Sequence, residues 1–381
     1  MSIVIFIFVI IGLSLLILGH EAGHFFAAKK LGMKVDEFGF GFPPRIFKKR
    51  YGETDYSFNW LPFGGFVRIA GESDPALSGD SAVIPSASEG ISGIATPRPD
   101  GARPVQQQVV YGARNDNGEE KNKLFFLQPA WKRAIVIAAG VTINFFLGWI
   151  LISAVLMMGT PNAILISGVQ AGSPAEDAGL VSGDILKGFE GAASFVAFVE
   201  ENRGEEIQFK ILRDGEEINF SAVPRVDAPP GEGALGIFLA DVGSEKMGFF
   251  AAIGEGFSSS LFIAAATFTA LYQLVVNLFL HGSLLEGVVG PVGIFGVAQS
   301  AGGIGMAYLV QVIAIISLNL FVVNLIPFPA LDGGRLFLIL VEKIKGSPVP
   351  KMVEAWANGL GFAFLLTLMA LLTVRDIGGL L

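Results

Sequence analysis

Long runs of uncharged apolar residues divide the chain and predict helices that cross a membrane. The first run, residues 2–19, continues through HEAGHFFAA to Lys29, and at ~1.5 Å per residue this length is enough to span a bilayer. We assign this helix to residues 1–30. Similar runs predict transmembrane helices at 131–158, 306–332 and 354–374. The pattern therefore predicts a polytopic α-helical membrane protein with about four transmembrane helices.

The distribution of charge predicts the orientation of these helices. The loop from Lys29 to Arg133 holds fifteen Lys and Arg, whereas residues 160–247 hold six against fifteen Asp and Glu. Because Lys and Arg concentrate on the cytoplasmic side of a membrane, the first loop is expected in the cytoplasm. The N-terminus and the second loop are then extracytoplasmic.

A further apolar segment, residues 256–280 within the region 247–282, complicates this topology. If the segment crossed the membrane, the basic loop that follows residues 306–332 would be moved away from the cytoplasmic side. We therefore interpret 247–282 as interfacial amphipathic or apolar helices. A fifth span over 256–280 stays open as the alternative.

Three stretches outside the apolar runs differ in composition. Residues 34–71 have alternating character, with turn signals at Pro43-Pro44, Tyr51-Gly52 and Gly64-Gly65, and predict a membrane-associated region of short β-hairpins. Residues 72–126 are rich in Ser, Gly, Pro and Ala and predict a flexible cytoplasmic insert. Residues 162–242 combine a short capped helix with alternating segments, which predicts a small α+β domain.

Composition limits the chemistry that is available. The chain is 52% hydrophobic and only 16% charged, which is outside the usual range of soluble domains. It has no cysteine and only three histidines, so disulfides and thiolate metal sites are excluded. The net charge of −8 argues against nucleic acid as a partner, because phosphate binding needs clustered Lys and Arg.

Two of the histidines belong to the motif His20-Glu21-Ala22-Gly23-His24 in the first predicted helix. A spacing of four residues puts both imidazoles on one helix face, where they can bind one metal ion, and Glu21 lies beside them to take a proton from water. A pair of structural histidines is the alternative. It is disfavoured because ionisable side chains inside a membrane helix are costly and usually functional.

Asp332 is the best candidate for a third metal ligand, since a catalytic zinc site usually has three from the protein. It follows a stretch broken by two prolines at the cytoplasmic end of the third span, and such a break needs protein or a water-filled cavity around it. A simple helix-terminating turn is the alternative. His281 is poorly placed, because the predicted topology puts it on the outer side. The active site is therefore expected toward the cytoplasm.

Taken together, these motifs resemble the site-2 protease family of intramembrane zinc metalloproteases, in its bacterial RseP-type form. HExxH in the first helix and NxxPxPxLDGG roughly 300 residues later carry the resemblance, with LPFGGFVRIAGE, FFLQPAWKRAIVIAAG and GPVGIFGVAQ between them. The resemblance implies that His20, His24 and Asp332 bind Zn2+ and that Glu21 is the catalytic base in metal-assisted hydrolysis of a peptide bond.

The resemblance also implies residues that contact the substrate. These are Asn324, Pro327 and Pro329 around the break in the third span, and Asn144 in the second. The family usually has Gly-Pro where this chain has Gly140-Val141, so a bend of the second helix is not assured. We further expect that Gly64 and Gly65 lie at a strand edge to which an unwound substrate pairs.

An intramembrane protease of this family would cleave transmembrane segments of other membrane proteins in regulated intramembrane proteolysis. It would reside in the lipid bilayer of the inner or plasma membrane. Anti-sigma factors anchored in the membrane and remnants of signal peptides are the substrates that the resemblance implies.

The segments GSPAEDAGL and GALGIFLA within 162–242 resemble a PDZ domain of the circularly permuted bacterial type, present in one copy. Such domains typically add a peptide to their sheet as an extra strand, and residues 233–237 form the carboxylate-binding loop by resemblance. A domain that only keeps bulky substrates away from the membrane site is an equal alternative.

Two other classes of function are open to a chain of this kind. A catalytically silent adaptor would bind peptides through the PDZ-like domain, but the intact set of His20, Glu21, His24 and Asp332 disfavours it. A metal transporter would use the same residues for transport. Transporters usually show paired halves, and no internal repeat stands out in the sequence.

Overall fold

The computed structural model describes residues 2–72, 123–213, 216–229, 233–281 and 290–378, so most of the insert expected at 72–126 lies outside the described residues. Within the described part, five helices are long and apolar enough to cross a membrane. They are α1 Ser2–Lys30, α2 Ala130–Met158, α5 Phe249–His281, α7 Met306–Leu325 and α9 Lys351–Gly378. Long apolar helices can cross a bilayer because each satisfies its own backbone hydrogen bonds.

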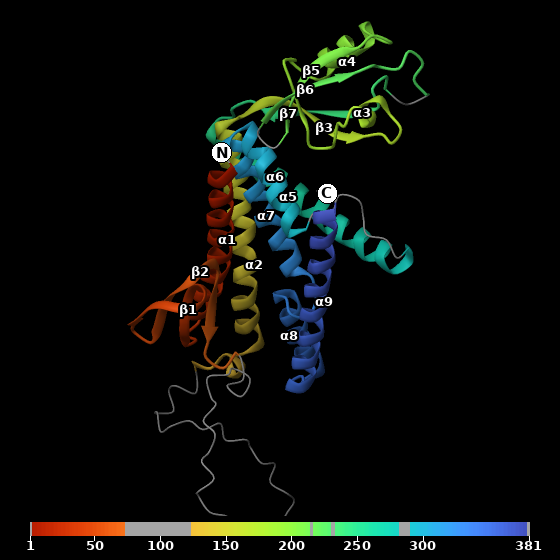
Figure 1. The fold of residues 1–381 in the computed structure, drawn as a ribbon. Coiled ribbons are helices and arrows are strands. Elements are labelled where there is room, and N and C mark those ends of the chain that lie inside the picture. The colour runs from red at the N-terminus through yellow and green to blue at the C-terminus, as the bar shows by residue number, and fades with distance from the viewer. Residues whose placement is uncertain (1, 73–122, 214–215, 230–232, 282–289, 379–381) are drawn as a thin grey trace, which may run out of the picture.

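Helices α1, α2 and α7 lie side by side and form the centre of the bundle (Figure 1). Two glycines let α7 approach closely. A Cβ at Gly148 of α2 would lie 2.6 Å from the side chain of Leu318, and one at Gly12 of α1 would lie 2.5 Å from Ile313. The Ser317 hydroxyl donates to the carbonyl oxygen of Asn144 at 2.8 Å. Small residues and a polar contact thus fix the helix spacing, as is usual in membranes.

Strands β1 Val35–Tyr51 and β2 Thr54–Ile69 form a single bent hairpin in place of the short hairpins predicted. Only Gly52, at φ 63°, lies in a turn between strands. The other two turn signals, Pro43-Pro44 and Gly64-Gly65, lie inside β1 and β2, whose pairing contains register shifts. Residues 38–40 of β1 are paired on both sides, with 65–67 and with 56–58 of β2. Segment 65–69 is consequently an outer edge of this sheet.

The hairpin packs against the end of α1 that carries the HExxH motif. Its apolar residues share a core with α1 and α2 that includes Phe25, Met33 and Ile69. At the hairpin tip, Lys29 donates to Glu53 at 2.9 Å, and this hydrogen bond holds the pKa of the Glu53 carboxyl below its ordinary value. The tip is therefore tied to the end of the first helix.

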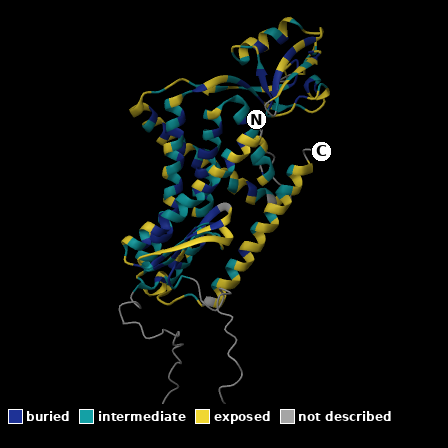
Figure 2. Ribbon diagram, turned by 60° about the vertical axis from the view of Figure 1, so that its left-hand side comes forward, coloured by how far each residue is buried: buried dark blue, intermediate teal, exposed yellow. Residues whose placement is uncertain are grey.

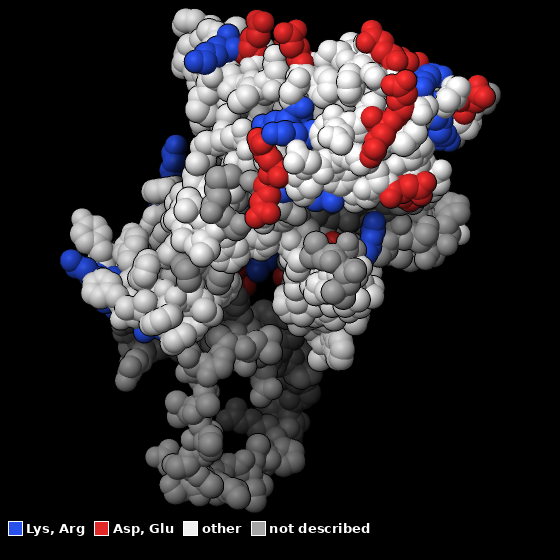
Figure 3. Space-filling model, turned by 45° about the horizontal axis from the view of Figure 1, so that its top comes forward, with Lys and Arg blue, Asp and Glu red and all other residues white. Residues whose placement is uncertain are grey.

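The second loop forms a separate domain at the end of the bundle opposite the hairpin (Figure 1). Its five-stranded sheet has the order β6-β5-β4-β3-β7. The strands are β3 Thr160–Val169, β4 Ile185–Lys187, β5 Ile207–Arg213, β6 Glu216–Ala222 and β7 Ile237–Ser244, and the helices are α3 Pro174–Asp177 and α4 Ala192–Glu201. Phe195 and Ile211 are fully enclosed in its core. Figure 3 shows Asp and Glu side chains spread over this domain.

The segment between the small domain and α7 begins and ends beside the same end of α2. The Met247 N–H donates to the carbonyl oxygen of Leu156 just before α5, and the Tyr308 hydroxyl donates to that of Pro161 just after α6 (Pro291–Ile304). Helix α5 runs obliquely to α1 and α2 in Figure 1. The start of α5 and the start of α7 therefore lie at the same end of the bundle. From there α7 runs back toward the HExxH end, whether or not α5 crosses the membrane. The number of spans stays a prediction.

The third predicted span, 306–332, is divided in the structure. Helix α7 ends at Leu325, and Asp332 is the first residue of a separate helix, α8 (Asp332–Lys345). Two prolines between them prevent a continuous helix, since each lacks a backbone N–H. Asp332 is therefore delivered by the start of α8 and not by the end of the third span.

Candidate metal centre

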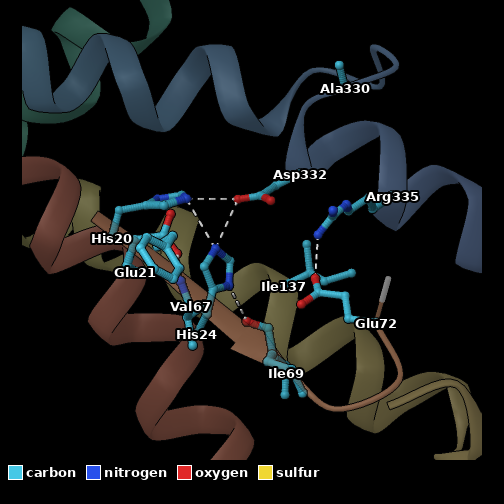
Figure 4. Close-up of a pocket in the computed structure, with 12 residues that line it drawn as sticks. His20, Glu21, His24, Val67, Ile69, Glu72, Ile137, Ala330, Asp332 and Arg335 are labelled. Carbon is cyan, nitrogen blue, oxygen red and sulfur yellow. Dashed lines mark hydrogen bonds and ion pairs between the residues drawn. The ribbon is translucent and has the colours of Figure 1, made fainter. Parts of the chain in front are cut away.

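Three side chains from distant parts of the sequence meet at the hairpin end of the bundle. His20 and His24 of α1 face Asp332 of α8, and the three point toward one another (Figure 4). Asp332 Oδ2 lies 3.0 Å from His20 Nε2 and 3.3 Å from His24 Nε2, and the two Nε2 atoms are 3.1 Å apart. The sequence predicted this set of three, and the structure brings it together.

These three atoms have the spacing of ligands around one zinc ion. A tetrahedral zinc with bonds of about 2.0–2.1 Å separates its ligand atoms by about 3.3 Å. The observed separations of 3.0, 3.1 and 3.3 Å are close to that value. The donor set of two imidazoles and a carboxylate is also one that catalytic zinc sites use. The residues present therefore fit a zinc ion.

His24 is fixed from behind by helix α2. Its Nδ1 lies 2.8 Å from the carbonyl oxygen of Val136, so Nδ1 carries the proton and Nε2 offers its lone pair to the site. Gly140, one turn further along α2, leaves the room that the ring needs: a Cβ there would lie 2.2 Å from His24 Nε2. Gly23 of α1 also lies close to α2, because a Cβ there would be 2.7 Å from the carbonyl oxygen of Ala139. The two helices cross in near contact beneath the metal ligands.

His20 is held by Asn144 of α2. Asn144 is 1% exposed, and its Nδ2 lies 3.1 Å from His20 Nδ1. Its Oδ1 is buried with no hydrogen-bond partner among the described residues. Binding a metal through Nε2 requires a proton on Nδ1, and rotating the amide by 180° brings Oδ1 to accept that proton. Asn144 thus faces the candidate ligand His20 and is not among the residues that line the pocket; its contact with substrate stays a prediction.

The two glycines after Asp332 let α8 begin tightly against the preceding loop. A Cβ at Gly333 would lie 2.1 Å from the carbonyl oxygen of Ile326, and a Cβ at Gly334 would lie 2.2 Å from that of Phe328. Any side chain at either position would displace the loop. The LDGG pattern therefore has a geometric cause, since it lets Asp332 reach the histidines.

Glu21 lies beside the three candidate ligands and is held by the β-hairpin. The Val67 N–H of β2 donates to Glu21 Oε2 at 3.0 Å. The strand edge at Val67 therefore faces the same site that the HExxH motif builds. Neither Val67 nor Val136 could be found from the sequence, because both contribute backbone atoms that any residue supplies.

A pocket of about 280 Å³ opens over this centre. Its lining residues are His20, Glu21, His24, Phe66, Val67, Ile69, Glu72, Val136, Ile137, Ala330, Asp332 and Arg335. Arg335 donates to Glu72 across the pocket (Figure 4), which joins α8 to the end of β2. This pair was not expected from the sequence. The spacing of Arg335, one turn after Asp332 on a helix, is the signal that would have placed it here.

The remaining predicted substrate residues are not among those that line the pocket. Pro327 and Pro329 belong to the loop before α8, and Asn324 is near the end of α7. Gly64, at φ 79°, lies against Ile17 of α1. Gly65 is nearer the chemistry, because a Cβ there would lie 3.8 Å from Glu21 Cγ.

An HExxH helix and a remote aspartate that converge inside an apolar helix bundle define a membrane metallopeptidase. Residues 8–368 match the model of peptidase family M50, and the chain belongs to this family. It is 31% identical over 408 aligned positions to the regulator of sigma-W protease RasP of Bacillus subtilis, and the alignment covers 95% of each chain. It is also 31% identical over 377 residues to a putative zinc metalloprotease of Clostridium perfringens, which covers 97% of this chain and 98% of the relative. The protein is thus an intramembrane zinc metalloprotease and a multi-pass membrane protein.

Proposed function

We propose that His20, His24 and Asp332 bind the zinc ion and that Glu21 is the catalytic base. The convergence of the three ligand atoms within 3.3 Å is the observation that carries this proposal. When bound, zinc supplies a Lewis acid and lowers the pKa of its water toward ~7. Glu21 then takes a proton from the attacking water and passes it to the leaving amine.

The outer edge of β2 is proposed to hold the substrate as an added strand. Backbone groups of alternate residues share an edge of a strand, so the Val67 N–H that faces Glu21 places the Gly65 N–H on the same side. On the opposite side, residues 65–67 pair with residues 38–40 of β1. A peptide in a helix has its carbonyl groups hydrogen-bonded, so a substrate must unwind before it can be cut. Pairing with this edge supports the unwound form beside the metal.

Gly65→Pro tests this edge, because proline removes the Gly65 N–H and leaves the inner pairing residues in place. We expect the rate of cleavage of a membrane substrate to fall at least about tenfold, because one backbone hydrogen bond to the substrate is lost. Rates with purified protein in detergent are compared with those of Gly65→Ala, which adds a side chain but keeps the N–H. An equal loss of activity in both variants would mean that the added side chain displaces the backbone of Gly39, 3.0 Å from a Cβ at Gly65. Unchanged cleavage by Gly65→Pro would refute edge pairing.

The small domain is proposed to be PDZ-like and extracytoplasmic. Its loop at residues 233–237 is anchored where the Ala175 N–H donates to the carbonyl oxygen of Leu235, and Gly236 has φ 72°. Strand β7 follows this loop at the edge of the sheet. In the middle of β7, Asp241 accepts from the Ala192 N–H at the start of α4. A peptide-binding groove between β7 and α4 fits this geometry, and so does a domain that only excludes bulky substrates.

The natural substrates are proposed to be membrane proteins with one transmembrane segment, such as anti-sigma factors or signal-peptide remnants. The relative named as a regulator of sigma-W supports the first group. The active site is proposed to face the cytoplasm, because the basic residues Lys29, Arg133 and Lys343 gather at the same end of the bundle as His24.

The first test is cleavage of a single-span membrane protein by the purified chain in detergent. Removing the metal with a chelator is expected to stop cleavage, and added zinc is expected to restore it, because the pocket offers three ligands of the type zinc prefers. Cleavage that persists after complete removal of the metal would refute the proposed mechanism. A chain that binds zinc and peptides but cuts no membrane substrate would instead support the adaptor.

A further inference from the structure

Figure 2 shows helix α9, which leads to the C-terminus, exposed along most of its length, and only 11% of its most apolar stretch is buried. The helix nevertheless contacts the loop that delivers Asp332. Gly361 is buried between the exposed residues Leu360 and Phe362. A Cβ at Gly361 would lie 2.6 Å from the carbonyl oxygen of Pro329. One turn earlier, Asn358 Oδ1 accepts from the Ala330 N–H at 3.0 Å. The helix therefore touches two consecutive residues of the loop.

Ala330 has an unusual backbone conformation that this contact supports. Its φ is 71°, and it is the one residue other than glycine with positive φ in the described part of the chain. A side chain is disfavoured in this left-handed region, so surrounding contacts must hold such a residue in place. The side-chain oxygen of Asn358 is the partner that receives the Ala330 N–H.

The conformation of Ala330 decides where Asp332 points. Only Leu331 separates the two residues, and the Leu331 N–H and carbonyl oxygen are both used in the turn, donating to Phe328 and accepting from Gly334. Phe328 is itself packed on α9, with its ring centroid 5.6 Å from that of Phe364. A change of φ at Ala330 would rotate the start of α8 and move the carboxylate away from the histidines.

We propose that Asn358 is a positioning residue for the metal ligand Asp332, which it orients through Ala330. The proposal rests on the assignment of Asp332 as a ligand. Asn358 does not contact the metal-binding atoms. It holds the strained turn in the one conformation that brings Asp332 Oδ2 to within 3.0 Å of His20. Its loss should therefore weaken zinc binding without removing a ligand.

The test measures zinc affinity of the full chain in detergent by competition with a chelator of known affinity. Asn358→Leu is expected to weaken zinc binding about tenfold, the low end of the range for losing a partner that orients a ligand. Ala330→Gly should then restore most of the affinity in the Asn358→Leu background, because glycine adopts positive φ without strain. A purely structural role of Asn358 would not be rescued by this second change.

Thr373→Val serves as the matched control on the same helix. Thr373 is half-buried, and its hydroxyl donates to the carbonyl oxygen of Met369 within α9, away from the loop before Asp332, so zinc affinity should equal that of the wild type. Thermal unfolding of the metal-free forms checks that each variant is folded. Unchanged zinc affinity in folded Asn358→Leu, or a loss that Ala330→Gly does not rescue, would overturn the proposal. A wild-type chain that binds no zinc would instead overturn the metal centre itself.

Discussion

Glu21→Gln is expected to lower the rate of cleavage by about 10²–10⁴-fold, the usual contribution of a general base, while zinc stays bound. Glutamine has the shape of glutamate but cannot take a proton from water. Its side-chain oxygen can still accept the hydrogen bond that the Val67 N–H donates at 3.0 Å. The geometry of the pocket should thus survive, and only proton transfer should be lost.

Rates on a single-span substrate and zinc content are measured on the same preparations. Glu53→Gln at the hairpin tip is the matched control: it makes the same chemical change in a partly exposed carboxylate whose partners are Lys29 and Lys123. Exposed ion pairs contribute little to stability, so its cleavage rate should stay near that of the wild type. Full activity in Glu21→Gln would require another base, and loss of zinc would mean that Glu21 supports the metal site instead.

The convergence of the three candidate ligands could be predicted because each of them has a local signature. A spacing of four residues on a helix fixes His20 and His24 relative to each other whatever surrounds them. Asp332 could be added because it follows a stretch broken by two prolines at the predicted cytoplasmic end of a span, the side where His20 and His24 were expected. The two prolines indicated a break in the third span, but not that Asp332 begins a new helix, because the start of α8 depends on packing against the loop.

The residues that orient the ligands were mostly missed, for a common physical reason. Val136 and Val67 act through backbone atoms, and Arg335 pairs with Glu72 from the far end of β2. Asn144 was expected to contact substrate, and its contact with His20 was not expected. Contacts between distant segments leave no periodic pattern in the sequence. The same holds for the hairpin, where register shifts and not turn signals set the pairing.

Gly140→Ala is expected to weaken zinc binding by at least about 10–100-fold, the range for disturbing the surroundings of a ligand. A Cβ at Gly140 would lie 2.2 Å from His24 Nε2, which no side chain can tolerate. The other ring nitrogen of His24, Nδ1, is hydrogen-bonded to the carbonyl oxygen of Val136 at 2.8 Å, so the ring cannot rotate away without breaking this hydrogen bond. Either the ring leaves the site or α1 and α2 separate, and both outcomes disturb the metal ligands.

The expected loss of zinc binding in Gly140→Ala runs against helix propensity. Alanine is favoured over glycine in a helix by about 1 kcal/mol, so the same change should be neutral or stabilising where space is open. Gly359→Ala on α9 is the matched control, because a Cβ there meets nothing within 4 Å. Zinc affinity is measured for both variants, for His24→Ala and for the double variant Gly140→Ala/His24→Ala. If Gly140 acts only by making room for His24, the double variant should bind zinc no more weakly than His24→Ala. A Gly140→Ala chain that binds zinc as tightly as Gly359→Ala would show that the close crossing of α1 and α2 does not hold His24 in place.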